Sequence, residues 1–157
     1  MPGTTALTTS ERGPSHERLA IVSETAESPF SSRIAIGDHR LTADEPVSAG
    51  GLNTGPDPYE YLLAGLGACT AMTLRLYATR KGWPLQHVEV RVRHVQHPTG
   101  GALKDVFERE IRLIGVLSED QRARLLSISD RCPVSRTLSA GALIQTTLSE
   151  TPPPGEA

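Results

Sequence analysis

Two residues of this chain, Cys69 and Cys132, can carry redox chemistry, and the sequence contains no other cysteine. A thiolate is a nucleophile, and a second thiol nearby can convert its oxidised form into a disulfide that thiol exchange reduces again. Such a cycle requires the fold to bring the two sulfur atoms together. Because a free cysteine is also among the most buried residue types, inert core packing is the alternative for each of them.

The residues around Cys132 favour ionisation of its thiol. Pro133 is typical of the first position of a helical turn, so Cys132 is predicted at or near the N-cap. There, exposed backbone N–H groups and the helix dipole favour a thiolate and lower the pKa. Arg131 and Arg136 add positive charge nearby. A simple Cys-Pro helix break, without chemistry, is the alternative interpretation.

Cys69 lies inside a long predicted helix. Asp57 is a suitable N-cap, Pro58 fits the first helical position, and Glu60 completes a capping-box pattern. Gly82 ends the segment, which gives about 24 residues and a length of about 36 Å. A helix of this length in a small domain is expected to cross the centre of the fold or a subunit boundary.

The apolar residues of this helix recur at alternating spacings of four and three, which predicts one continuous stripe facing a partner. The stripe comprises Leu62, Leu66, Cys69, Thr73 and Leu76. Gly65 and Gly67 each cost a helix interior roughly 0.5–1 kcal/mol relative to alanine. We therefore expect another element, or a substrate, to approach the helix closely beside Cys69, with ordinary packing as the alternative.

The remaining elements follow from local patterns and predict an α+β fold. Strands are expected over 18–24, 30–36 and 39–43, a loop over 44–56, a hairpin of strands 86–97 and 103–113, a helix from Ser118 to near Cys132, a short helix from Pro133 to Gly141, and a last strand over 142–148. Residues 1–17 and 151–157 have no periodicity and are expected to be a flexible arm and tail around one domain, 18–150.

Composition restricts the classes of function. A formal net charge of -2 gives no electrostatic reason to expect nucleic acid or an anionic membrane as a partner. The N-terminus lacks the pattern of a secretory signal. Charged residues, among them Glu60 and Arg75, interrupt the most apolar segment, so no membrane-spanning segment is expected. These features favour a cytoplasmic protein, and in a reducing cytoplasm a lasting structural disulfide is not expected.

Metal and hydrolase chemistry find little support. His87 and His97 share one face of their predicted strand and His94 takes the other, so the three cannot converge from it. A metal site built on His16 or His39 has no further support, and no Gly-x-Ser-x-Gly nucleophile elbow occurs. We therefore expect neither a metal nor another cofactor.

Several segments together resemble the OsmC/Ohr family of thiol peroxidases over about residues 18–150, and most closely its OsmC-like branch. These segments are Asp44-Glu45-Pro46, Gly50-Gly51, Gly55-Pro56-Asp57-Pro58-Tyr59-Glu60, the run from Leu66 to Leu74 around Cys69, and Cys132-Pro133-Val134. The resemblance implies an intertwined homodimer in which sheets from both chains wrap two long central helices. It also implies active sites at the dimer interface, each containing both cysteines.

By the same resemblance, Cys69 is the peroxidatic residue, whose thiolate attacks the O–O bond of an organic hydroperoxide or hydrogen peroxide and becomes a sulfenic acid. Cys132 resolves this to a disulfide, which an external dithiol such as a lipoyl group reduces. Glu60 is the candidate for the carboxylate that activates the site in the peroxidases.

The chain departs from the peroxidase pattern at three places. Glu60 comes one position later than the activating glutamate, which is about 100° around a helix. No arginine occurs at 27–30, so Arg33 and Arg40 are the nearest substitutes for the arginine that holds the thiolate. Ser135 stands where the OsmC-like branch commonly has histidine.

These departures keep two alternatives open. Without a cationic partner, a buried Cys69 thiol should have a raised pKa and react slowly. The first alternative is a non-catalytic protein that binds a small apolar or electrophilic ligand. The second is a redox sensor that signals through its disulfide.

Overall fold

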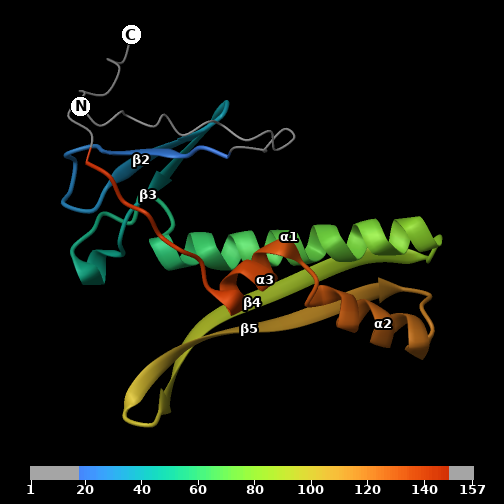
Figure 1. The fold of residues 1–157 in the computed structure, drawn as a ribbon. Coiled ribbons are helices and arrows are strands. Elements are labelled where there is room, and N and C mark those ends of the chain that lie inside the picture. Colours follow the sequence, from blue (N-terminus) through green and yellow to red (C-terminus); the bar gives the residue numbers. More distant parts are fainter. Residues whose placement is uncertain (1–17, 149–157) are drawn as a thin grey trace, which may run out of the picture. The chain divides into compact units, whose positions relative to one another are not determined.

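The computed structural model describes residues 18–148, which fall into two compact units that divide after Pro58. Each unit has its own antiparallel sheet (Figure 1), and helices are confined to the second unit apart from one short 3₁₀ turn. The predicted α+β class is confirmed. The expected arm at 1–17 and tail at 151–157 lie outside the described residues.

The N-terminal unit is a three-stranded antiparallel sheet followed by a loop. Its strands β1 (Ile21–Glu24), β2 (Ser32–Ile36) and β3 (His39–Ala43) pair in the order β1-β2-β3. Each lies within the segment predicted for it. The loop then contains the 3₁₀ helix η1 (Val47–Ala49).

A buried carboxylate organises this loop. Asp44 is 2 % exposed and accepts hydrogen bonds from the amides of Glu45, Leu52 and Thr54 at 2.9, 3.0 and 3.2 Å, and from the Thr54 hydroxyl at 3.0 Å. Burial alone would raise the pKa of Asp44, but these bonds outweigh it and lower the pKa. A β-carbon at Gly51 would collide with the Glu45 carbonyl, so the loop closes around Asp44 only with glycine there.

The C-terminal unit places one long helix on a β-hairpin. Helix α1 (Pro58–Lys81) has the predicted bounds, and β4 (Leu85–Thr99) pairs antiparallel with β5 (Ala102–Gly115). Helix α2 (Glu119–Ser129) begins with the predicted capping box at Ser118, and α3 (Pro133–Ala140) follows. Figure 1 shows α1 lying along the hairpin.

The core of this unit lies where α1, α2 and the start of β4 meet. It consists of Leu74, Ala78, Leu85, Leu125 and Ile128. Helix α1 approaches the middle of the hairpin closely at Gly67, where an added β-carbon would lie 3.4 Å from a methyl group of Val92. The close approach expected from Gly67 is therefore present, whereas the described residues leave open space around Gly65.

Of the five residues of the predicted stripe of α1, Leu66 is buried, Cys69 and Thr73 are half-buried, and Leu62 and Leu76 are exposed in the chain. The partner that the stripe was predicted to face stays a prediction. The helix buries a line with a spacing of four residues: Leu66, Thr70, Leu74 and Ala78. Leu62 and Leu76 are 44 % and 51 % exposed. A search for apolar residues alone misses this buried line, because Thr70 is polar. Its hydroxyl can be buried because it donates to the Leu66 carbonyl at 2.7 Å.

The predicted last strand over 142–148 is wrong. The segment has no strand pairing within the part of the chain that the structure describes, and Leu143, Ile144 and Leu148 are 85 %, 85 % and 93 % exposed. Its apolar residues favour a strand, but a strand forms only when another strand offers an unpaired edge.

Helix α1 also corrects the expectation about membrane-spanning segments. It is long and apolar enough to cross a membrane, with a mean hydropathy of 1.2 over its best 18-residue window, because its Leu- and Ala-rich middle outweighs the few charges. Core helices pass the same test by length and composition. Helix α1 packs one line of side chains against its own unit, as such a helix does.

Candidate active site

The structure brings the two cysteines together, although they lie on different helices. Cys69 is half-buried near the middle of α1, and Cys132 is fully buried at the N-cap of α3. Both are free thiols, and each side chain contributes to the shift in the pKa of the other. The fold therefore places the two thiols next to each other within one chain.

The position of Cys132 follows from the local sequence between α2 and α3. The C-cap of α2 is Asp130, and the Cys132 amide then donates to the Ser129 carbonyl at 3.3 Å. Pro133 starts α3 directly afterwards, and the Arg136 amide donates to the Cys132 carbonyl at 3.1 Å. The predicted N-cap position of Cys132 is confirmed.

The environment of Cys132 favours its ionised form. Burial raises its pKa, but hydrogen bonds from the Cys69 thiol, the Ser135 and Val134 amides and the Thr70 hydroxyl outweigh burial, so the pKa of Cys132 is lowered. These amides belong to the first turn of α3, where the helix dipole also favours a negative charge.

The environment of Cys69 favours its neutral thiol instead. Burial raises the pKa of Cys69, and the hydrogen bond with Cys132 raises it further, while the Val134 amide and the Thr73 hydroxyl only partly offset this. The raised pKa expected from the sequence is therefore present. Of the two neighbouring thiols, Cys132 is therefore the one that ionises more readily.

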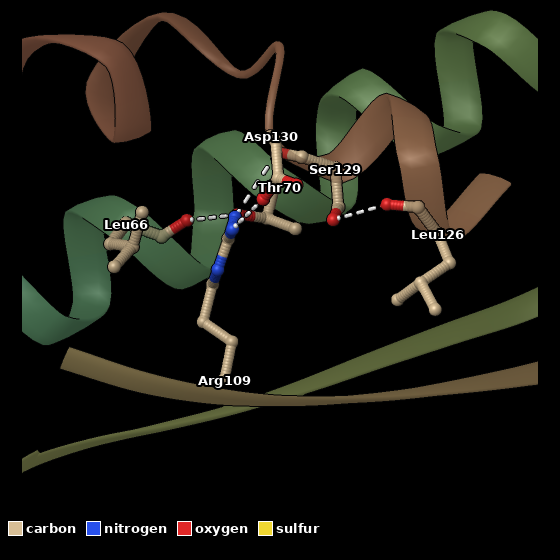
Figure 2. Close-up of polar contacts among 6 residues, drawn as sticks. All are labelled: Leu66, Thr70, Arg109, Leu126, Ser129 and Asp130. Atoms are coloured by element: carbon tan, nitrogen blue, oxygen red, sulfur yellow. Dashed lines mark hydrogen bonds and ion pairs between the residues drawn. The ribbon is translucent and has the colours of Figure 1, made fainter. Parts of the chain in front are cut away.

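An arginine that the sequence did not suggest contacts residues that adjoin both cysteines in the chain, Thr70, Ser129 and Asp130 (Figure 2). Arg109 of β5 donates through Nη1 to the Thr70 hydroxyl and to the Ser129 carbonyl, both at 3.1 Å, and through Nη2 to Asp130 at 2.7 Å. Its side chain is 14 % exposed. Thr70 directly follows Cys69, and Asp130 closely precedes Cys132.

A signal for Arg109 was present in the sequence. In the hairpin register Arg109 pairs with Val92, and Ile111 pairs with Val90. Arg109 thus occupies the half-buried face that Ile111 and Leu113 share on β5. A charged residue in an apolar row indicates a buried polar partner, but the sequence does not identify that partner.

The residues that the sequence suggested as activating groups, Glu60, Arg33 and Arg40, lie in three different elements, α1, β2 and β3. Glu60 is exposed in the first turn of α1, about two and a half turns before Cys69. Arg40 belongs to the N-terminal unit and donates to the carbonyls of Gly37 and His39 in its own turn. Arg33 lies in β2 of the same unit.

A cavity of about 450 Å³ opens beside Arg109. It lies between α1, β5 and α3, and its lining includes Leu66, Phe107, Arg109, Ser135 and Leu138. Both apolar and charged side chains border it. Neither cysteine is among its lining residues, but Leu66 belongs to the helix of Cys69 and Ser135 to the first turn of the helix that Cys132 caps.

Comparison with known proteins places the chain. A two-cysteine site on a helix packed against an antiparallel hairpin defines a thiol-bearing α+β domain, and the profile of the OsmC-like protein family matches residues 51–147. The chain therefore belongs to the OsmC-like protein family. No curated protein matches the sequence.

Solved structures share this fold. An organic hydroperoxide resistance protein from Legionella pneumophila matches with a TM-score of 0.63 at 17 % identity, over 80 % of this chain and 91 % of that one. An OsmC-like protein from Mycoplasma pneumoniae matches with 0.64 at 22 % identity, over 82 % and 89 %. An organic hydroperoxide resistance protein from Vibrio cholerae with captopril in one active site matches with 0.60 at 18 % identity, over 80 % and 86 %.

Proposed function

We propose that this protein is a thiol-dependent peroxidase that reduces organic hydroperoxides or hydrogen peroxide through Cys69 and Cys132. The observation that carries the proposal is that two free thiols from different helices lie next to each other, so that each contributes to the shift in the pKa of the other. Membership of a family whose structural relatives include organic hydroperoxide resistance proteins supports it.

The two sulfur atoms differ in their exposure to solvent and in their tendency to ionise, and we give them different roles on these grounds. Cys69 is half-buried and can meet a peroxide, whereas Cys132 is fully buried. Cys132 is the better thiolate and serves as the base that receives the Cys69 proton. Cys69 therefore attacks and Cys132 resolves. The raised pKa of Cys69 leaves little thiolate on the attacking sulfur, so the first step is slow.

In the proposed cycle, the cysteine pair starts with one proton, which the Cys69 sulfur holds. As the Cys69 proton passes to Cys132, the Cys69 sulfur bonds to one peroxide oxygen and the O–O bond breaks. The departing alkoxide takes up that proton and leaves as alcohol, and Cys69 is now a sulfenic acid. The Cys132 thiolate attacks the Cys69 sulfur and expels hydroxide, which forms the disulfide. An external dithiol of the lipoyl type restores both thiols and becomes a disulfide itself.

The proposal includes a homodimer in the cytoplasm. Met72 and Leu76 of α1 are 70 % and 51 % exposed, and the apolar residues of 142–148 are largely exposed as well. A second copy would cover such surfaces and offer a strand edge to 142–148. Glu60 receives no chemical step, because it lies about two and a half turns from Cys69.

Trapping the intermediate tests the order of the two cysteines. In Cys132→Ser the resolving thiol is absent, so treatment with cumene hydroperoxide should leave a Cys69 sulfenic acid that dimedone captures. Peptide mass spectrometry locates the adduct. Cys69→Ser is the matched control and should give no adduct. An adduct on Cys132 in the Cys69→Ser protein at the wild-type rate would reverse the assignment.

The cavity beside Arg109 supports a second candidate, a non-catalytic protein that binds a small ligand. Its mixed apolar and charged lining suits a small amphipathic molecule, and the raised pKa of Cys69 gives a weak nucleophile. This candidate predicts that Cys69→Ser keeps the ligand affinity of the wild type. A thermal-shift screen on both proteins would contradict it if every stabilising ligand required the thiol.

A further inference from the structure

We propose that Arg109 is the positioning residue of the cysteine pair, which it holds in register and polarises through Thr70 and Ser129. The inference rests on the proposed redox function of Cys69 and Cys132. It adds an arginine from β5 to a site whose arginine was expected from the N-terminal strands.

The hydrogen bonds of Arg109 connect the two segments that carry the thiols. Arg109 contacts Thr70, the residue after Cys69, and also Ser129 and Asp130, which precede Cys132 (Figure 2). One side chain thereby bridges the two segments that carry the thiols. The planar guanidinium can serve three acceptors in fixed directions, which a lysine ammonium on a flexible stem does less well.

The Ser129 carbonyl gives a direct link to Cys132. It accepts from Arg109 Nη1 at 3.1 Å and from the Cys132 amide at 3.3 Å. Because both donors share one acceptor oxygen, displacement of Arg109 would release a constraint on the backbone of Cys132. This carbonyl lies at the C-terminal end of α2, where a positive charge is favourable.

Thr70 gives the second link. Its hydroxyl carries one hydrogen, which points to the Leu66 carbonyl at 2.7 Å, and its oxygen accepts from Arg109 at 3.1 Å. The same hydroxyl is among the groups that lower the pKa of Cys132. Because Arg109 occupies an acceptor position and polarises the hydroxyl, Thr70 becomes the better donor and can turn its hydrogen toward a Cys132 thiolate.

Burial makes these contacts effective. Thr70 and Cys132 are 0 % exposed, and Arg109 is 14 % exposed on its side chain. Hydrogen bonds and charges act more strongly where water is excluded. The arginines of the exposed rim differ: Arg91 is 67 % exposed and pairs with its neighbour Glu89 at 2.7 Å.

The test measures thiol ionisation without peroxide. The ultraviolet absorbance of the thiolate is titrated with pH in reduced protein, for Arg109→Gln, Arg109→Lys, Thr70→Val and Thr70→Ser. Arg91→Gln, on the same hairpin, is the matched control. Circular dichroism establishes that each variant is folded.

Arg109→Gln and Thr70→Val should move the first thiol titration up by about one pH unit, so that about tenfold less thiolate is present below the transition. Thr70→Ser should restore the wild-type curve, Arg109→Lys should lie between, and Arg91→Gln should leave it unchanged. Superimposable curves for wild type, Arg109→Gln and Thr70→Val would overturn the inference.

Two further outcomes keep the test decisive. If Arg109→Gln does not fold, the comparison of Thr70→Val with Thr70→Ser decides, because it changes one hydroxyl. If the titration shifts as expected but the wild type consumes no hydroperoxide, the inference holds and the proposed function fails. If the wild type consumes hydroperoxide and the titrations coincide, only the inference fails.

Discussion

The guanidinium of Arg109 donates to the hydroxyl of Thr70 at 3.1 Å, across 39 positions of the sequence. Thr70 follows Cys69 in α1, and the remaining hydrogen bonds of Arg109 reach Ser129 and Asp130 next to Cys132. The contact therefore ties the hairpin to both cysteine-bearing segments. It makes the local structure around the thiols dependent on a residue of β5.

The first prediction concerns the coupling of the two thiols. Burial raises the pKa of Cys69, and its hydrogen bond with Cys132 raises it further. Removal of that partner in Cys132→Ala should lower the pKa of Cys69, so the pH profile of its alkylation by iodoacetamide should move to lower pH. Thr137→Ala, in the same helix α3, is the control. An unchanged or upward-shifted profile would contradict the coupling.

The second prediction concerns the loop around Asp44. Hydrogen bonds to its carboxylate outweigh burial, so the folded-state pKa lies below the unfolded value. The stabilisation is complete above the unfolded pKa, about 3.9, and is lost as pH falls through the folded pKa. Asp44→Asn should thus lower the Tm of the N-terminal unit at neutral pH, with a smaller difference from wild type in acid.

Thermal unfolding at several pH values measures this effect. Asp38→Asn, in the exposed turn between β2 and β3, is the matched control and should change little at any pH. A difference between Asp44→Asn and wild type that stays constant from neutral pH to pH 2 would show that the charge of Asp44 does not stabilise the loop.

The third prediction compares two glycines of α1. A β-carbon at Gly67 would already meet Val92 at 3.4 Å, so Gly67→Leu should overpack this contact and destabilise the protein by about 1–3 kcal/mol. Gly65 has open space within the described chain, so Gly65→Ala should stabilise the helix by up to about 1 kcal/mol. Urea denaturation measures both, and the reverse order of stability would contradict the packing of α1 on β4.

The fourth prediction concerns the exposed apolar residues of α1. If a second copy covers them, Met72→Glu and Leu76→Glu should convert a dimer into a monomer in sedimentation or light scattering. Thr79→Glu, exposed near the end of the same helix, is the control and should stay dimeric. A wild-type protein that is monomeric at micromolar concentration would refute the proposed homodimer.

Local signals in the sequence were sufficient for most elements, the strand over 142–148 excepted, and for one part of the site. Pro58 and Gly82 bound α1 as predicted, and Pro133 places Cys132 at an N-cap. These features depend on neighbouring residues alone. The sequence could not place Arg109 beside Thr70, because this contact depends on how the hairpin packs on α1.

The differences between the structure and the sequence patterns share a physical cause. Residues 142–148 have the apolar pattern of a strand but no pairing strand within the described residues. Within the chain, α1 buries the polar Thr70, which the predicted stripe left out, whereas the apolar Leu62 and Leu76 of the stripe are exposed. The partner predicted to face them stays a prediction. In each case the structure of a segment depends on which other element packs or pairs with it, and the residue type alone does not identify that element.

The most direct test of the account is the reaction of reduced wild-type protein with one equivalent of cumene hydroperoxide. We predict stoichiometric loss of hydroperoxide and an intrachain Cys69–Cys132 disulfide in non-reducing peptide maps, with no consumption by Cys69→Ser. Protein that leaves both cumene hydroperoxide and hydrogen peroxide untouched over hours, while both thiols remain titratable, would contradict the account.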